Sequence, residues 1–310
     1  KIQQLQQHAV ACAERFEHDN ALKFYEKILE LQPDNCDVMD ACAELCVDAA
    51  KPELALTLFT RSMALKPEEN PTKYLNAAQL QTGHSALGCF QKGVQLLERE
   101  LQQRPEAEAE IRARLSAALC SIAELYMTDL CDEETAETEC ERYMTAAQTH
   151  NPQDPQMCVQ FANLRLCQQR PEDAKNIVYK AVRIINALEP DDKPVLDCQV
   201  QIGKLLLELG QYDEAVEWLK GILELDDEWI ETWYLLGFGH HLQSDVANAQ
   251  HCIAQALRLV RKSAMEGDDE DEELVAQVQA LSEELGGVQP AEGPPEPDYS
   301  DDEGEDMVES

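Results

Sequence analysis

A set of side chains recurs along this chain at a fixed interval of 34 residues. Near the N-terminus, four positions repeat in order: Ala21, Tyr25, Leu29 and Pro33 are followed 34 positions later by Ala55, Phe59, Met63 and Pro67. An interval of this length is typical of a stacked array, in which each unit buries its apolar face only against its neighbours. The interval therefore predicts a repeat solenoid and argues against a domain built around one central core.

The C-terminal third of the chain has the same interval. Here the matching pairs are Gly203 and Gly237, Ala215 and Ala249, Leu219 and Ile253, and Leu223 and Leu257. The 310-residue chain is 44% hydrophobic but only 5% aromatic. This composition, rich in Ala, Leu, Glu and Gln, suits helices better than strands. We therefore expect an all-α fold in which both ends of the chain use one helical unit.

The repeated residues resemble the consensus of the tetratricopeptide repeat family. Trp233, Leu236 and Gly237 match its W-x-x-L-G stretch, and the segment GQYDEAVEWLKGILELDD is similar to the turn and second helix of such a unit. Small residues at these positions let the two helices of a hairpin approach closely. The resemblance implies a right-handed superhelical solenoid of about seven helical hairpins, whose first helices line a concave groove.

The register of this pattern assigns residues 1–263 to the tetratricopeptide superhelix. The predicted hairpins are residues 2–35, 36–69, 70–105, 106–152, 153–190, 193–228 and 230–263. In the third hairpin, Ala86 and Phe90 take the small and bulky roles if the loop is shorter by three residues. The fourth hairpin has an extended turn near Asp129 to Thr135.

The chain is strongly acidic, most of all at its C-terminus. It has 61 acidic and 25 basic residues, a formal net charge of -36, and from Ser263 onward it has 18 acidic residues and no Lys or Arg. Residues 264–285 predict an acidic linker and a capping helix, and residues 286–310, rich in Pro, Gly, Glu and Asp, predict a disordered acidic tail. This charge repels nucleic acids and anionic membranes, so the natural complement is a basic partner.

No motif in the sequence predicts catalysis, a cofactor or a bound metal. The 12 cysteines contain no CxxC pair, and in a reducing compartment cysteine fills helix interfaces as a small hydrophobe. His240, His241 and His251 could approach one another on one hairpin, but no Cys or carboxylate is placed to complete a metal site. No run of about 18 apolar residues predicts a membrane span. We expect a binding protein that is not an enzyme and contacts neither nucleic acid nor membrane directly.

In the family that the chain resembles, partners bind the exposed side of each first helix. In the second repeat this side carries Asp37, Asp40, Glu44 and Asp48, whose spacings of three and four residues put them on one helical face. A cation would relieve their mutual repulsion, so this stripe suits a basic ligand. The alternative interpretation is a solvated acidic helix face, because the whole chain is acidic.

The seventh repeat has a different surface at the equivalent positions. Glu231, Tyr234, Phe238 and His241 place two aromatic rings one turn apart beside a carboxylate, and Glu208 of the preceding repeat completes the set of partner-binding candidates. Exposed aromatic side chains often anchor a partner. The alternative is that Tyr234 and Phe238 pack beneath the capping helix.

The repeat body and the acidic tail together resemble one group of assembly chaperones. The segment QYDEAVEWLKGILELDDEWIETWYLLGFGHHL and the tail EGPPEPDYSDDEGEDMVES are similar to those of the fungal chaperones dedicated to large-subunit ribosomal protein L4. The resemblance implies that the client is a newly made basic ribosomal protein, L4-like, bound through its extended loop and escorted from cytoplasm to nucleus for pre-ribosome assembly. A histone-type acidic chaperone and a general scaffold in a multiprotein complex remain alternatives.

Three further expectations concern the state of the protein in the cell. We expect a monomer. Ser300, which three acidic residues follow directly, is a candidate site for an acidophilic kinase. The densest basic cluster has only Arg258, Arg261 and Lys262, too few for a nuclear address, so the client or a third factor is expected to supply the import signal.

Overall fold

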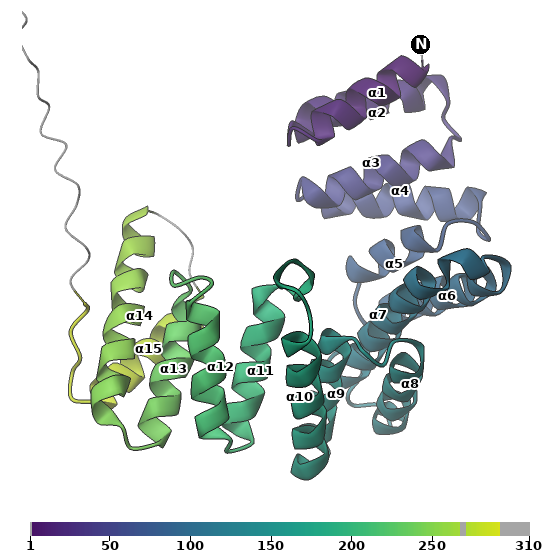
Figure 1. Ribbon diagram of the computed structural model, residues 1–310. Helices are drawn as coiled ribbons and strands as arrows, with labels where there is room; N and C mark the ends of the chain where they lie inside the picture. The colour runs from purple at the N-terminus through teal and green to yellow at the C-terminus, as the bar shows by residue number, and fades with distance from the viewer. Residues whose placement is uncertain (1, 267–270, 292–310) are drawn as a thin grey trace, which may run out of the picture. The chain divides into compact units, whose positions relative to one another are not determined.

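The computed structural model describes residues 2–266 and 271–291. Within these ranges the chain forms fifteen α-helices, two short 3-10 helices and no strand, which confirms the predicted all-α class. The chain divides into two compact units, unit 1 (Lys1–Glu189) and unit 2 (Pro190–Ser310). Figure 1 shows unit 1 in purple to teal and unit 2 in green to yellow.

Unit 1 consists of five helical hairpins. Each helix packs mainly against the helices before and after it in the sequence, and α7 also contacts α9. The hairpins are α1 (Ile2–Ala13) with α2 (His18–Leu31), α3 (Cys36–Asp48) with α4 (Pro52–Leu65), α5 (Pro71–Gln79) with α6 (Gly83–Gln103), α7 (Glu108–Met127) with α8 (Ala136–His150), and α9 (Pro155–Cys167) with α10 (Pro171–Asn186). Packing between sequence neighbours is the defining property of a repeat solenoid.

The described residues of unit 2 form two hairpins and one additional helix. The hairpins are α11 (Leu196–Glu208) with α12 (Tyr212–Leu223), and α13 (Ile230–Leu242) with α14 (Val246–Glu266). The last helix, α15 (Glu272–Glu284), packs against both α13 and α14. Because α15 covers the apolar side of the last hairpin, it is the predicted capping helix.

Prolines and polar side chains determine where several helices begin. Four helices have proline in their first turn, where the missing N–H costs no hydrogen bond: Pro52, Pro71, Pro155 and Pro171. Asn35 precedes α3, and its Oδ1 accepts a 3.2 Å hydrogen bond from the backbone N–H of Val38. Such a cap stabilises a helix because it satisfies one of the four unpaired N–H groups at the helix start.

The small residues of the repeat lie where the two helices of a hairpin touch. A Cβ atom added to Gly203 would lie 2.6 Å from Cδ2 of Leu219, and one added to Gly237 would lie 3.0 Å from Cδ1 of Ile253. Leu219 and Ile253 are fully buried, and they are the bulky residues that the sequence places one interval apart. The 34-residue interval is therefore the repetition of one packing contact.

Each of the seven predicted hairpins corresponds to one observed helix pair, although α14 runs three residues past the predicted end at 263 and the third hairpin differs in detail. Its shortening lies in the first helix and not in the loop, because α5 has 9 residues whereas α3 has 13. At the end of α5, Nε2 of Gln81 donates a 2.8 Å hydrogen bond to the carbonyl oxygen of Ala77, one of the last carbonyl groups of the helix. Ala86 and Phe90 are buried, as their small and bulky roles require.

Two other boundaries can be compared with the sequence. The extended turn of the fourth hairpin is confirmed, since α7 ends at Met127 and α8 begins at Ala136. Residues 286–291 were expected to belong to a disordered tail, yet they pack along α14, where the backbone N–H of Ala291 donates a 2.9 Å hydrogen bond to the carbonyl oxygen of Ala254. The apolar side chain of Val288 packs with Ala249 and Ile253, which explains this difference. The remainder of the tail, with Ser300, lies outside the described residues.

Candidate partner-binding site

The carboxylates predicted for the second repeat lie on α3, but only three of them share one environment. Asp37, Glu44 and Asp48 are exposed, and their spacings of seven and four residues place them on one face of the helix. None of the three forms a side-chain hydrogen bond or ion pair with another described residue. We call these three residues the α3 acidic face.

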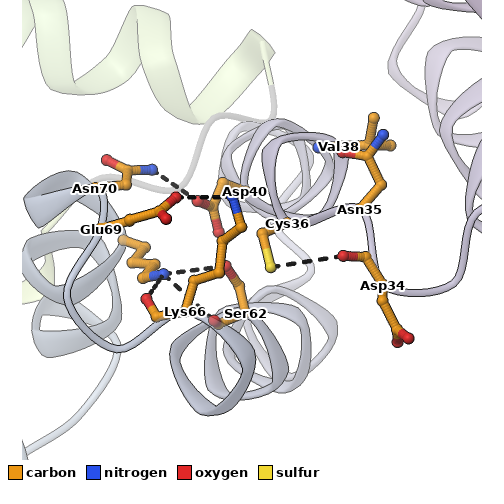
Figure 2. A network of polar contacts seen from close by, with 10 residues as sticks. Asp34, Asn35, Cys36, Val38, Asp40, Ser62, Lys66, Glu69 and Asn70 are labelled. Atoms are coloured by element: carbon orange, nitrogen blue, oxygen red, sulfur yellow. Dashed lines mark hydrogen bonds and ion pairs between the residues drawn. The ribbon is translucent and has the colours of Figure 1, made fainter.

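Asp40 is not exposed, so the prediction of four exposed carboxylates is wrong at this position. Its side chain is 5% exposed, and its Oδ2 accepts a 2.7 Å hydrogen bond from Nδ2 of Asn70, which Figure 2 shows. Asn70 precedes α5 in a left-handed conformation with φ of 53°. Asp40 therefore connects α3 to the start of α5, while its contact with a partner stays a prediction. Helical spacing alone did not show which carboxylate faces the next hairpin.

A buried lysine lies at the same junction between the second and third hairpins. Lys73 is fully buried, and its Nζ donates hydrogen bonds to the backbone oxygens of Ser62, at 3.3 Å, and Lys66, at 2.7 Å. These carbonyl groups end α4, where the helix dipole favours a positive charge. The hairpin that contains the α3 acidic face is therefore joined to the third hairpin by buried hydrogen bonds.

The α3 acidic face concentrates negative charge around Glu44. Burial raises the pKa of Glu44, and the charges of Asp40 and Asp48 raise it further. The ionised form of Glu44 is thus disfavoured where it stands, first because partial burial removes water from the carboxylate and then because neighbouring carboxylates repel it. A cation bound near Glu44 would offset the repulsion from Asp40 and Asp48, so we expect the α3 acidic face to favour a basic ligand.

Three of the four candidate residues of the seventh repeat line a pocket in unit 2. The pocket has a volume of about 590 Å³ and lies between α11, α13 and α15. Four predicted residues line it: Glu208 from α11, and Glu231, Tyr234 and Phe238 from α13. The other lining residues are Lys204, Leu207, Leu235, Leu242, Asp271, Glu273, Leu274 and Gln277. We call this site the unit 2 pocket.

Tyr234 and Phe238 both pack beneath the capping helix and line the pocket, which were the two alternatives that the sequence left open. Their rings are stacked, with 6.2 Å between centroids and 14° between ring planes. Both pack against the apolar cluster that contains Leu281 of α15, and Tyr234 also packs against the cluster that contains Val278. Each ring also keeps part of its surface exposed in the pocket. Packing beneath the capping helix and lining a concave site are therefore compatible.

The unit 2 pocket is acidic, and one lysine lies within it. Nζ of Lys204 lies 2.5 Å from Oε1 of Glu231. Glu208 is one turn after Lys204 on α11, is exposed, and forms no side-chain hydrogen bond or ion pair within the described residues. Asp271 and Glu273 add two carboxylates from the start of α15. The lining therefore keeps a negative charge after the Lys204–Glu231 pair is formed.

The predicted residue His241 does not line the pocket. Its Nε2 lies 3.2 Å from Oε1 of Glu284, near the end of α15. His240 is buried beside Asp245, and burial lowers the pKa of His240. Over residues 2–266 and 271–291, no three potential metal ligands come together. In the same part of the chain, no helix combines the length and apolar character that crossing a bilayer requires.

Stacked hairpins in which a bulky side chain packs on a small residue of the facing helix define a tetratricopeptide repeat protein. The family profile of the tetratricopeptide repeat matches residues 5–35 and 196–228, one segment in each unit. A solved tetratricopeptide repeat protein from Parabacteroides merdae shares the fold, with a TM-score of 0.59 and 14% identity over 91% of this chain and 98% of that chain.

Within this class, the chain belongs to the family of fungal proteins named probable assembly chaperone of rpl4. The Schizosaccharomyces pombe protein is 30% identical over 266 residues, which are 79% of this chain and 76% of that protein. The Emericella nidulans protein is 27% identical over 74% of this chain and 62% of its own length. The solved structure of the assembly chaperone of RpL4 (Acl4), residues 1–338, has a TM-score of 0.72 and 25% identity over 79% of this chain and 97% of that chain. These relatives are assembly chaperones and not enzymes, as expected for this chain.

Sequence reasoning missed the residues that close the pocket. The sequence identified α15 as a cap but did not show that Leu274 and Gln277 face α13. Lys204 was also missed, although its position four residues before Glu208 places both side chains on one face of α11. Contacts between helices that are not sequence neighbours have no signature in a repeat pattern, which records only packing within and between adjacent hairpins.

Proposed function

We propose that this chain is an assembly chaperone that binds newly made ribosomal protein L4 and escorts it to the pre-ribosome. The observation that carries the proposal is the 30% identity to the S. pombe probable assembly chaperone of rpl4 over 79% of this chain. A ribosomal protein is cationic because it must bind RNA, and when free it binds other polyanions. A chaperone with a net charge of -36 covers that charge until assembly.

The α3 acidic face and the unit 2 pocket are the two surfaces that suit such a client. On the face, Asp37, Glu44 and Asp48 are exposed and unpaired among the described residues. They attract lysine and arginine side chains of an extended basic loop without selecting one of them. The pocket offers aromatic rings and further carboxylates, which can hold an individual side chain.

The chaperone is proposed to act as a monomer that moves with its client between cytoplasm and nucleus. Its densest basic cluster, Arg258, Arg261 and Lys262, has three residues, and Lys262 already pairs with Glu228 at 2.6 Å. The import signal would then come from the client or a third factor. The chaperone would have to leave that part of the client exposed while it covers the basic loop.

The direct test measures binding of the purified chain to purified L4 by calorimetry at physiological salt. Core histones serve as a second basic client. We expect a one-to-one complex with L4 and at least about tenfold weaker binding to histones, because electrostatic attraction alone is not selective. Equal affinities would favour a histone-type chaperone, and no binding of L4 would refute the proposal.

The α3 acidic face is tested by reversing its charge without touching the buried Asp40. The variant combines Asp37→Lys, Glu44→Lys and Asp48→Lys, and we expect L4 binding to weaken by at least about a hundredfold, because three attractive contacts become repulsive. The matched control reverses three exposed glutamates of the same unit, Glu30, Glu53 and Glu98. Both variants change the net charge equally. If both weaken binding to the same extent, only the total charge matters and the face is not a site.

A further inference from the structure

Unit 1 already contains one arginine that is held by an aromatic ring and a carboxylate. The guanidinium carbon of Arg165 lies 4.4 Å from the centroid of the Phe161 ring. The same guanidinium donates to both carboxylate oxygens of Glu141, with 2.8 Å between Nη2 and Oε1. A planar cation on a ring face with a forked carboxylate contact is the geometry that separates arginine from lysine. The fold of this chain therefore supports such a site.

The unit 2 pocket has the same components, but none of the described residues that line it is an arginine. Tyr234 and Phe238 supply two nearly parallel rings with exposed surface. Glu208 supplies a carboxylate with no side-chain partner in the described residues, and Glu231 supplies a second one. The volume of about 590 Å³ falls in the range of about 300–1,000 Å³ that is usual for ligand pockets. One long side chain fits this space.

Lys204 shows that the pocket accepts a cation. Its Nζ lies 2.5 Å from Oε1 of Glu231, so one carboxylate is already neutralised by the chain itself. Lys204 makes no cation–π contact with Tyr234 or Phe238 within the described residues. It also leaves Glu208 unpaired. A compact ammonium group thus satisfies only one of the interactions that the pocket offers.

We propose that the unit 2 pocket binds one arginine side chain of the client and that Lys204 is an internal competitor for the same place. The incoming guanidinium lies on an aromatic ring face, donates to Glu208 and Glu231, and displaces Nζ of Lys204 towards solvent. This inference rests on the proposed function in one respect, because the arginine is taken to belong to the basic client. Lysine is disfavoured because it cannot contact two carboxylates and a ring at once.

The probe for this subsite is N-acetyl-arginine amide, which carries the side chain without charged ends. It is titrated into the full chain while the ring signals of Tyr234 and Phe238 are followed by NMR. We expect saturable shifts with the arginine probe and at least about fivefold weaker binding of N-acetyl-lysine amide. The uncharged citrulline analogue should cause no saturable shift. Equal binding of the arginine and lysine probes, or no saturable shift with either, would overturn the assignment.

Variants of the lining separate an arginine subsite from a general acidic surface. Glu208→Gln should weaken the arginine probe by about fivefold, since a charged hydrogen bond is lost. Lys204→Met should strengthen it by about threefold, because Glu231 becomes free. The control Lys220→Met removes a lysine of α12 that pairs with Glu217 outside the pocket, and it should leave the affinity unchanged. Weaker binding in Lys204→Met would contradict the role of competitor.

The two proposals fail in different ways. Binding of L4 to the parent chain tests the chaperone function, whereas the arginine probe tests the subsite. If L4 binds but the probe does not, the subsite is refuted and the chaperone function stands. If the probe binds with the expected variant effects but L4 does not, the pocket recognises arginine and the client has been misidentified.

Discussion

The α3 acidic face and the unit 2 pocket use equivalent positions of two repeats in different ways. Asp40 and Glu44 on α3 correspond to Tyr234 and Phe238 on α13. In the second repeat, Asp40 is buried and accepts a hydrogen bond from Asn70, whereas Glu44 is exposed. In the seventh, both are aromatic and lie partly beneath α15. The neighbouring element, and not the repeat position, decides what a residue does.

The two surfaces also differ in how their charge is balanced. Asp37, Glu44 and Asp48 face solvent without a basic partner in the described residues, whereas Glu231 in the pocket is paired with Lys204. Exposed charges act over a range of about 10 Å at 0.1 M salt and are screened beyond it. Contacts inside a pocket act at short range and depend on shape. We therefore expect the face to attract a basic segment and the pocket to select a side chain.

The largest effect on stability is expected when the buried Asp40 and the exposed Glu44, which both lie on α3, are replaced by the same residue. Asp40→Lys should lower the free energy of unfolding by about 3–5 kcal/mol, because it buries a new charge opposite Asn70 and removes the acceptor. Glu44→Lys should change it by about 1 kcal/mol or less. Urea denaturation followed by circular dichroism measures both.

Asp40→Asn is the matched control, because it keeps an acceptor for Asn70 at nearly the same volume. We expect this variant to remain within about 1 kcal/mol of the parent, since the buried Oδ1 of Asp40 has no hydrogen-bond partner to lose. If Asp40→Lys were as stable as Glu44→Lys, the carboxylate of Asp40 would have no structural role. The sequence-based prediction that Asp40 is one of four exposed carboxylates would then be supported.

A smaller effect should separate the surfaces by their response to salt. Neutralising the face with Asp37→Asn, Glu44→Gln and Asp48→Asn should weaken L4 binding about tenfold at low salt and reduce the dependence of affinity on salt. Phe238→Ala should also weaken binding about tenfold, because an aromatic anchor is lost, but it should leave the salt dependence unchanged. Calorimetry between about 50 and 500 mM salt tests both expectations.

The fold could be predicted from the sequence because the packing contact repeats. Gly203 and Gly237 each receive the bulky side chain that the interval pairs with them, so the interval located the hairpins near the ends of the chain, and the resemblance to the repeat consensus placed the middle ones. The shortened α5 was harder to predict. Its end depends on a side-chain hydrogen bond from Gln81 to Ala77, which is a local feature of one repeat.

The candidate site was predictable only in part. Spacing placed Glu231, Tyr234 and Phe238 on one face of a first helix, and they do line one pocket with Glu208. Spacing could not show that His241 turns towards Glu284 or that Asp40 is buried, because both depend on residues outside their own hairpin. The contribution of Lys204 follows from the contact between α11 and α13, which no single repeat encodes.

The smallest expected effect concerns Glu44, which neighbouring carboxylates repel on the α3 acidic face, whereas Glu231 in the pocket is paired with Lys204. The pKa of Glu44 in the folded protein is raised above the usual 4.5 by burial and by Asp40 and Asp48. A group with a raised folded pKa contributes stability that is present at low pH and is lost as pH rises through that pKa. Near neutral pH, Glu44→Gln should therefore raise the melting temperature by about 1–2 °C.

The difference between Glu44→Gln and the parent should shrink as the pH falls through the raised pKa, because the parent then takes up a proton and loses the same repulsion. Thermal melts at a series of pH values between about 4 and 7 measure this change. Glu98→Gln, which removes one exposed carboxylate from α6, is the control for the loss of a charge elsewhere in unit 1. A gain for Glu44→Gln that is the same at every pH would mean that packing, and not charge, limits stability at this position. The face would then lack the unrelieved repulsion that makes it attractive to a basic client.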